Sequence, residues 1–169
     1  MSTLAVLGNT LLTTRIAHRL TRAGHTVRTN GLLGTDDTSV ASTVQEAVTG
    51  AAVVLTSFDS AAATASAMTE ALPAMSHGAI WLDIGPAAYE DTAADARAER
   101  HRMIRIAALV TEHRGILIAT VPAAIDPHGW LLGDPILSSA TDLVIRSNEP
   151  RLGLVGLEAQ FGDLEYAYP

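Results

Sequence analysis

The stretch Leu4-Ala5-Val6-Leu7-Gly8-Asn9-Thr10-Leu11-Leu12-Thr13 decides the fold of this chain. The apolar residues before Gly8 predict a buried strand, and the apolar spacing over 10–23 predicts a helix that ends at Gly24. A strand, a tight glycine turn and a helix are the parts of a G-x-G-x-x-G fingerprint, which holds the diphosphate of a dinucleotide. Of its three glycines, only Gly8 is present here.

Threonines stand at the other two glycine positions of this fingerprint. Thr10 places a side chain where the backbone must approach a pyrophosphate, and Thr13 places a β-branched residue where a glycine lets helix and strand pack closely. We therefore expect the architecture of a dinucleotide-binding unit without its usual ligand, and no nicotinamide cofactor.

The composition of the chain excludes several classes of protein. At 169 residues it fits one domain with a sizeable core. A formal charge of -7 argues against a nucleic-acid surface, which needs a basic face. The sequence shows neither an apolar run long enough for a membrane span nor the pattern of a secretion signal, so we expect a cytoplasmic protein that does not bind membranes.

Two missing residue types restrict the chemistry further. Without cysteine the chain has no disulfide, thiol nucleophile or thiolate metal site, and without lysine it has no Schiff-base chemistry. The six histidines form no H-x-x-x-H or H-E-x-x-H pattern, so no metal is expected.

Apolar runs alternate with helical segments along the chain, a pattern typical of a parallel sheet covered by helices. The prediction is an α/β fold with a Rossmann-like, doubly wound, mostly parallel sheet, forming a single domain over 1–169. Residues 123–140 hold two prolines and two glycines, which predict an atypical loop at the cleft. Strands are expected at 3–7, 26–29, 52–56, 79–84, 115–121 and 142–147, and helices at 10–23, 40–48, 60–72, 89–112 and 149–160.

The order of several segments resembles the N-terminal domain of the β-hydroxyacid dehydrogenases and imine reductases, in the 6-phosphogluconate dehydrogenase-like superfamily. The resemblance implies an NAD(P)-binding domain that stands here without the family's helical second domain, whose loss would leave apolar surface and favour a homo-oligomer. The segments that carry the resemblance are Val6-Leu7-Gly8, Ala23-Gly24-His25-Thr26-Val27, Ala52-Val53-Val54-Leu55-Thr56, Gly78-Ala79-Ile80-Trp81-Leu82-Asp83-Ile84, 142–147, 152–160 and 161–166.

The departures from this family fall at one rim of the predicted sheet. The family's catalytic Ser-Gly-Gly turn corresponds to Pro122-Ala123-Ala124, its Leu-Pro segment to Ser57-Phe58 and its Ser-Thr pair to Gly85-Pro86. After the second strand, Asn30 stands where an acidic residue would bind the ribose hydroxyls or an arginine a 2′-phosphate. Their shared location predicts that the inherited hydride-transfer site is gone or rebuilt.

Ligands of open parallel sheets bind outside the carboxyl ends of the strands, so candidate site residues were chosen there. A small organic ligand is expected in a cleft formed by Gly8, Asn9, Thr10, Asn30, Ser57 and Asp59. Its pocket walls would be Phe58, Pro122 and Trp130. The candidate catalytic residues are Asp83, Tyr89, Asp126 and His128.

Each catalytic candidate also has a structural explanation. Burial beside Trp81 would raise the pKa of Asp83 and suit it to proton transfer, whereas Asp59 is expected to cap the next helix. His128 with Asp126 or Asp134 would form an acid/base pair. In the alternative, the apolar residues 130–132 cover surface left by the missing domain while the histidine is solvated.

Arginines add one further candidate ligand contact. Arg15, Arg19 and Arg22 follow helical spacing and are expected to form a solvated stripe. Arg28 lies in a predicted strand and is a candidate to reach a phosphate or a partner.

These observations lead to one favoured function and two alternatives. The favoured hypothesis is a repurposed Rossmann domain that binds a small molecule and catalyses a non-redox proton transfer, such as cyclisation, isomerisation or dehydration. The first alternative is an NAD(P)H-dependent reductase that completes its site across a homodimer, with NADPH as cofactor and with Arg28 and Asn30 at the ribose end. The second is a non-catalytic accessory or scaffold subunit.

Overall fold

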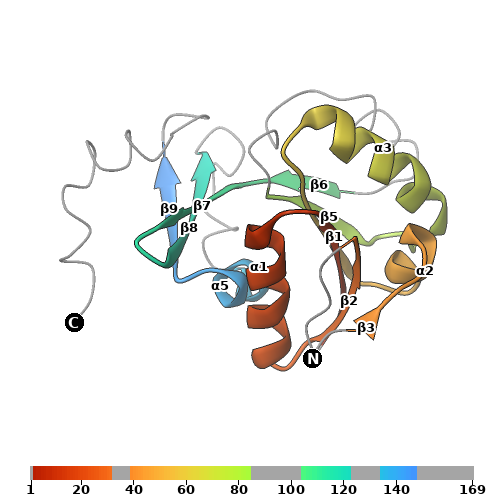
Figure 1. The fold of residues 1–169 in the computed structure, drawn as a ribbon, viewed down its shortest axis with the longest axis horizontal. Helices are drawn as coiled ribbons and strands as arrows, with labels where there is room; N and C mark the ends of the chain where they lie inside the picture. Colours follow the sequence, from red (N-terminus) through yellow and green to blue (C-terminus); the bar gives the residue numbers. More distant parts are fainter. Residues whose placement is uncertain (1, 32–38, 85–103, 123–133, 148–169) are drawn as a thin grey trace.

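A computed structural model describes residues 2–31, 39–84, 104–122 and 134–147 of the chain. Its main sheet has six strands in the order β3-β2-β1-β4-β5-β6, and all neighbouring strands are parallel (Figure 1). This order is that of a doubly wound dinucleotide-binding sheet, so the predicted α/β architecture is confirmed. The strands are β1 (Thr3–Gly8), β2 (Thr26–Asn30), β3 (Ser39–Val40), β4 (Val53–Ser57), β5 (Ile80–Asp83) and β6 (Ile104–Ala107).

Helices cover both faces of this sheet. The alternation of side chains along β1 shows how: Leu4 and Val6 join a buried cluster with α1 and α5, whereas Ala5 and Leu7 join a second cluster with α2 and α3. All five residues of the central strand β4 are buried, as the largely apolar run at 52–56 predicts. The helices are α1 (Leu11–Arg22), α2 (Val44–Val48), α3 (Ala61–Ala71) with the 3-10 turn η1 (Leu72–Ala74), and α5 (Pro135–Ala140).

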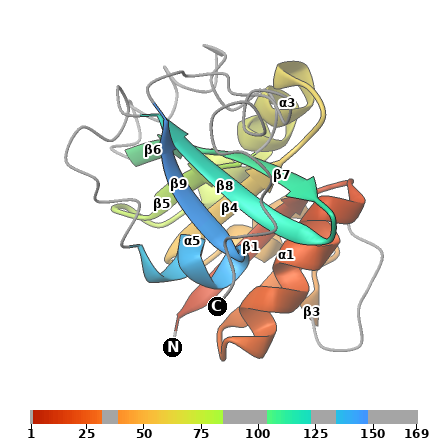
Figure 2. The ribbon, with the colours of Figure 1, turned by 90° about the vertical axis from the view of Figure 1, so that its left-hand side faces the viewer.

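A second, three-stranded sheet follows the parallel one, in the order β7-β8-β9. β7 (Leu109–His113) and β8 (Ile116–Pro122) form an antiparallel hairpin, and β9 (Leu143–Ser147) pairs with β8 in parallel. Figure 2 shows β8 and β9 side by side, with α5 and α1 nearby. Buried residues Leu117, Ala119 and Val121 of β8 belong to the same cluster as Leu4 and Val6, so the two sheets share one core.

Two predicted elements differ from the structure. The helix expected at 89–112 is wrong for residues 104–112, which belong to β6 and β7, and the rest of it lies outside the described residues. Ile104 and Ile106 alternate with Arg105, a period of two that suits a strand, and β5 offers the pairing edge. The charged residues before this segment favoured a helix. The expected helix at 149–160 also lies outside the described residues.

The second correction concerns the expected loop at 123–140, because its last six residues form α5. Pro135 occupies the first helical position, where its missing N–H costs no hydrogen bond. Asp134 is the N-cap, and its carboxylate accepts hydrogen bonds from the backbone N–H of Ile136 (2.8 Å) and Leu137 (2.9 Å). The proline that indicated a loop therefore begins a helix, and Asp134 caps it, while its expected partner His128 lies outside the described residues.

Candidate functional site

The carboxyl ends of β2, β1, β4 and β5 bring four of the predicted site residues together along one edge of the sheet. Gly8 is in register with Ser57, the neighbouring Leu7 with Asn30, and Thr56 with Asp83. Asn30, Gly8, Ser57 and Asp83 thus follow one another across what we call the carboxyl edge. This is the position at which open parallel sheets bind ligands.

Gly8 makes the tight turn that the sequence predicts. A Cβ atom at this position would lie 2.4 Å from the carbonyl oxygen of Ser57 and 2.7 Å from Oγ1 of Thr13. Gly31 comes next to the same turn: its φ is +81°, and a Cβ there would lie 3.2 Å from the carbonyl oxygen of Gly8. The backbone at Gly8 is therefore packed too closely for a side chain, and the positive φ of Gly31 favours glycine there.

Thr10 and Thr13 are hydrogen-bonded to each other at the start of α1. Thr10 is the N-cap, with extended backbone dihedrals, and its Oγ1 accepts from the backbone N–H of Thr13 at 3.2 Å. The two hydroxyl oxygens lie 2.7 Å apart, and the Thr13 hydroxyl donates to the carbonyl oxygen of Ser57 at 3.1 Å. Side chains thus join α1 to the end of β4, where the fingerprint would have bare glycines.

Thr13 crowds the turn as expected, but from inside the fold: a Cβ at Gly8 would lie 2.7 Å from its Oγ1 and 2.8 Å from its Cγ2. Thr13 is 0% exposed and lies between α1 and β4, where its hydroxyl is satisfied by Ser57. The β-branched side chain of Thr13 fits between the helix and the strand because residue 8 is a glycine and has no Cβ in that space. Thr10, unlike Thr13, is half-buried, so part of its side chain faces solvent at the turn.

The amino end of α1 points its unpaired backbone N–H groups toward the carboxyl edge. Its first turn contains no acidic residue, and Asn9 beside it is exposed. Leu11, the first residue of the helix, is 74% exposed, unusual for a large apolar side chain. The positive end of the helix dipole is therefore available to an anion, with an apolar side chain beside it.

At the end of β2, the uncharged Asn30 is held in place by the neighbouring segment. Its Nδ2 donates to the carbonyl oxygen of Ala41 at 3.1 Å. Arg28 does not reach this end: its guanidinium donates to the carbonyl oxygen of Thr49 at 2.6 Å and contacts that of Glu46 at 3.5 Å. Arg28 thus caps the carboxyl end of α2, so the expectation that it contacts a ligand at the ribose end is wrong.

Asp83 takes part in a buried hydrogen-bond chain under the carboxyl edge. The indole Nε1–H of Trp81 donates to Oγ1 of Thr56 at 2.8 Å, and the Thr56 hydroxyl donates to Oδ1 of Asp83 at 2.9 Å. Because an indole nitrogen only donates, Thr56 is the acceptor in the first bond, and its own hydroxyl proton is directed to Asp83. Asp83 is 1% exposed, so its carboxyl lies inside the protein instead of facing the cleft.

Sequence reasoning missed Thr56, although a signal was present. It is a polar residue in the otherwise apolar run Ala52-Val53-Val54-Leu55-Thr56, and buried hydroxyls in such strands need partners. In the next strand, β5, Trp81 and Asp83 point to the same face of the sheet, since residues two apart share a face.

The residues after β4 have different surroundings. Ser57 is 1% exposed and contributes its carbonyl oxygen to the turn, while Phe58 is half-buried against the cluster of α2 and α3. Asp59 is exposed, and Ser60 is the N-cap of α3, with Oγ accepting from the N–H of Ala63 at 3.3 Å. The prediction that Asp59 caps this helix is therefore wrong by one residue.

The remaining candidates cannot be placed with these. Pro122 ends β8 in register with Ser147. Tyr89, Asp126, His128 and Trp130 lie outside the described residues. In the described ranges no three His, Asp or Glu side chains are grouped to hold a metal ion, and no helix is long and apolar enough to cross a membrane.

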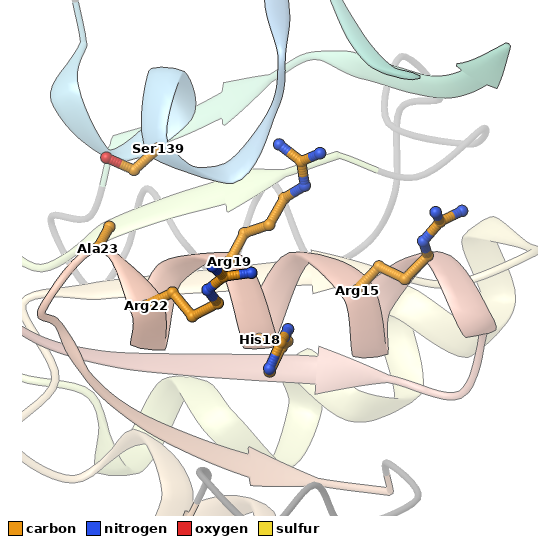
Figure 3. Close-up of a pocket in the computed structure, with 6 residues that line it drawn as sticks. All are labelled: Arg15, His18, Arg19, Arg22, Ala23 and Ser139. Atoms are coloured by element: carbon orange, nitrogen blue, oxygen red, sulfur yellow. The ribbon is translucent and has the colours of Figure 1, made fainter. Parts of the chain in front are cut away.

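A concave surface lies along α1, away from the carboxyl edge (Figure 3). Its volume is about 560 Å³, and we call it the α1 groove. The stripe expected to be solvated is tied to the second sheet at two points: Arg15 pairs with Glu112, and Arg19 binds both carboxylate oxygens of Asp142 at 2.7 Å. The groove is lined by Arg15, His18, Arg19, Arg22, Ala23 and Ser139.

Asp142 is the centre of this attachment. Its Oδ2 accepts from the backbone N–H of Leu117 at 2.8 Å, and its own N–H donates to the carbonyl oxygen of Leu117 at 2.8 Å. Burial acts to raise the pKa of the Asp142 carboxyl. The Leu117 N–H and the Arg19 guanidinium, together with the charge of Arg15, outweigh it and hold that pKa below its ordinary value.

Comparison with known proteins places the fold. Residues 3–109 match the sequence model of the NAD binding domain of 6-phosphogluconate dehydrogenase. The chain is similar to the structure of Mycobacterium tuberculosis 3-hydroxyisobutyrate dehydrogenase with L-serine, with a TM-score of 0.68 and 22% identity over 86% of this chain and 54% of that one. No curated protein matched the sequence.

Imine reductases have the same fold. The enzyme from Myxococcus stipitatus in complex with NADP+ gives a TM-score of 0.63 at 14% identity, over 86% of this chain and 54% of that chain. The Streptomyces aurantiacus imine reductase gives 0.63 at 19%, over 94% and 59%. The present chain spans between half and three fifths of the length of these structures.

Proposed function

Because the chain belongs to the family of NAD-binding domains of 6-phosphogluconate dehydrogenase, we propose that it binds a nicotinamide dinucleotide at the carboxyl edge. It would serve as the cofactor half of an NAD(P)H-dependent reductase. Similar structures contain NAD+ or NADP+, which supports this alternative better than the non-redox hypothesis. Of the catalytic residues named for that hypothesis, the described ranges include Asp83 alone.

The turn at Gly8 is the observation that carries this proposal. A Cβ there would lie 2.4 Å from the Ser57 carbonyl oxygen, so the turn keeps the close backbone packing that brings the amino end of α1 to the end of β1. Thr13 leaves the cleft open because it is fully buried. Gly8 and the first turn of α1 would hold the pyrophosphate, a fit that the lack of acidic residues in this turn supports.

The residues at the ribose end favour a site without a strong preference for the 2′-phosphate that distinguishes NADPH from NADH. In the described part of the chain, β2 ends at Asn30. Its neutral amide does not repel a 2′-phosphate, and it is not the carboxylate that would accept hydrogen bonds from the ribose hydroxyls. Since Arg28 is bound to the end of α2, no guanidinium from this strand would pair with a 2′-phosphate. We propose that NADH and NADPH bind with affinities within about tenfold of each other.

A bound nicotinamide would supply hydride to an electrophilic carbon, such as that of a small carbonyl or imine compound. The protein's own residues would bind and orient the dinucleotide. The hydrogen bonds that link Trp81, Thr56 and Asp83 would keep the end of β5 rigid beside it. We propose that a second copy of the chain completes the substrate side of the cleft, with the exposed Leu11 near the contact.

Calorimetric titration of the purified chain with NADPH and with NADH tests the proposal. We expect micromolar dissociation constants for both. The Arg22→Ala variant, at the opposite end of α1, should bind as the parent does. Absence of heat with both nucleotides at millimolar concentration, in a sample whose circular dichroism shows it folded, would overturn the cofactor role.

Light scattering at the same concentrations tests the second copy separately. A dimer is expected, and its mass should not depend on the nucleotide if the subunits associate through permanently apolar surface. A monomer under all conditions would remove the second copy from the proposal.

A further inference from the structure

We propose that Thr10 competes with the pyrophosphate for the amino end of α1 and thereby sets the affinity of the chain for dinucleotides. We call the group formed by Thr10, Thr13 and the carbonyl oxygen of Ser57 the threonine clasp. This inference rests on the proposed function, since it concerns the same edge of the sheet. It goes further by naming a residue whose hydrogen bonds, rather than its bulk, oppose binding.

The direction of every hydrogen bond in the clasp follows from its chemistry. A carbonyl oxygen only accepts, so the single hydroxyl proton of Thr13 goes to Ser57, at 3.1 Å. The 2.7 Å contact between the two hydroxyl oxygens then requires Thr10 to donate to Thr13. Oγ1 of Thr10 also accepts from the backbone N–H of Thr13, at 3.2 Å. Both the proton and an acceptor site of Thr10 are therefore in use.

This arrangement withholds two donors that an anion would use. At a helix amino end, phosphate oxygens are bound by the free backbone N–H groups of the first turn. In this chain the N–H of Thr13 is already capped by Thr10, and the Thr10 hydroxyl proton is directed inward. A pyrophosphate must displace the Thr10 side chain or bind with fewer hydrogen bonds, and either outcome weakens binding.

Two substitutions separate this competition from simple steric obstruction. Thr10→Gly removes both the hydroxyl and the bulk, and glycine is a tolerated N-cap, so the helix is retained. Thr10→Val removes the hydroxyl but keeps the size and shape of the side chain. If hydrogen bonding opposes the ligand, both variants bind more tightly. If bulk alone opposes it, Thr10→Val binds as weakly as the parent.

The experiment is calorimetric titration of the full chain and its variants with NADPH, and with inorganic pyrophosphate as a probe of the anion site alone. We expect Thr10→Gly to lower the dissociation constant of NADPH about tenfold, the size of one displaced cap, and Thr10→Val about threefold. Thr10→Ser keeps the hydroxyl and should restore the weaker affinity of the parent. Arg22→Ala, remote from the clasp, is the matched control, and thermal unfolding confirms that each variant is folded.

The outcomes distinguish the clasp from the proposed function. If the parent binds NADPH and Thr10→Gly binds equally or less well, the clasp is overturned while the cofactor role stands. If Thr10→Gly and Thr10→Val both bind while the parent does not, the clasp is supported and the cofactor role of the parent is overturned. Tighter binding by Thr10→Gly but not by Thr10→Val overturns hydrogen-bond competition in favour of bulk. Failure of all variants to bind overturns both proposals.

Discussion

The hydroxyl of Thr13 donates a 3.1 Å hydrogen bond to the backbone carbonyl oxygen of Ser57, joining the first turn of α1 to the last residue of β4. Both residues are almost completely buried. A side chain therefore performs the attachment of helix to strand that a third glycine would permit through backbone contact.

Removal of this hydroxyl should destabilise the fold. Thr13→Ala leaves the Ser57 carbonyl without this donor and opens space beside Gly8, so we expect a loss of about 2 kcal/mol in the free energy of unfolding. Thr13→Ser keeps the hydrogen bond and should lose about half as much. Urea unfolding at neutral pH measures both. Equal stability of Thr13→Ala and the parent would show that the bond contributes nothing.

The turn at Gly8 should tolerate no side chain. In Gly8→Ala the added Cβ meets the Ser57 carbonyl oxygen at 2.4 Å, and backbone on both sides must move. We expect a loss of more than about 3 kcal/mol or failure to fold. Gly24→Ala is the matched control, because its φ of +91° is strained but its Cβ meets nothing within 4 Å. This control should cost about 1 kcal/mol, and similar thermal stability of the two variants would contradict the prediction.

Loss of the Thr56 hydroxyl should remove one hydrogen bond from each of two buried groups. Thr56→Val is nearly isosteric, yet it removes the acceptor of the Trp81 indole N–H and the donor to Asp83. We expect a loss of about 2 to 4 kcal/mol in the free energy of unfolding, together with a changed near-ultraviolet circular dichroism of Trp81. Thr64→Val, another buried threonine of this face whose hydroxyl binds only its own helix, should cost less. Equal losses at the two positions would argue against a special role of the chain of bonds.

Stability should decline in acid partly through Asp142. The pKa of this carboxyl in the folded protein is below its ordinary value of 3.8, so ionisation favours the folded state. The contribution is complete above the unfolded pKa and is lost as pH falls through the lower folded pKa. Asp142→Asn should therefore be less stable than the parent by about 1 kcal/mol at pH 6, a modest value because Arg19 is a third exposed.

Urea unfolding between pH 6 and pH 2.5 tests this sign. The difference between the parent and Asp142→Asn should stay constant down to about pH 4.5 and shrink below it. Arg22→Ala is the control on the same helix, since it lines the groove but is not part of this ion pair. A difference that grows in acid would contradict the assignment.

The sequence predicts the centre of the parallel sheet well because β1 and β4 are buried on both faces and contain runs of apolar residues. It fails at 104–112, where alternation of Ile104, Arg105 and Ile106 competes with charged residues of helical character. Period alone cannot show that β5 presents an open edge to this segment. Pairing partners distant in sequence decided the outcome.

The site was predictable in position but not in detail. Gly8, Asn30, Ser57 and Asp83 lie along one edge because parallel strands end together. Whether a side chain at that edge faces a ligand or the interior depends on local packing. Thr13 was expected to crowd the turn and is fully buried, and Asp83 was a candidate for the cleft and lies beneath it.

Asp142 accepts a hydrogen bond from the backbone N–H of Leu117, donates one to its carbonyl oxygen, and forms an ion pair with Arg19. Asp142 therefore joins β8, the start of β9 and α1. Neither sheet can open at this point without exposing the core that both cover. Unfolding should consequently be cooperative across the two sheets, and the amide proton of Leu117 should exchange with solvent as slowly as those at the centre of β4.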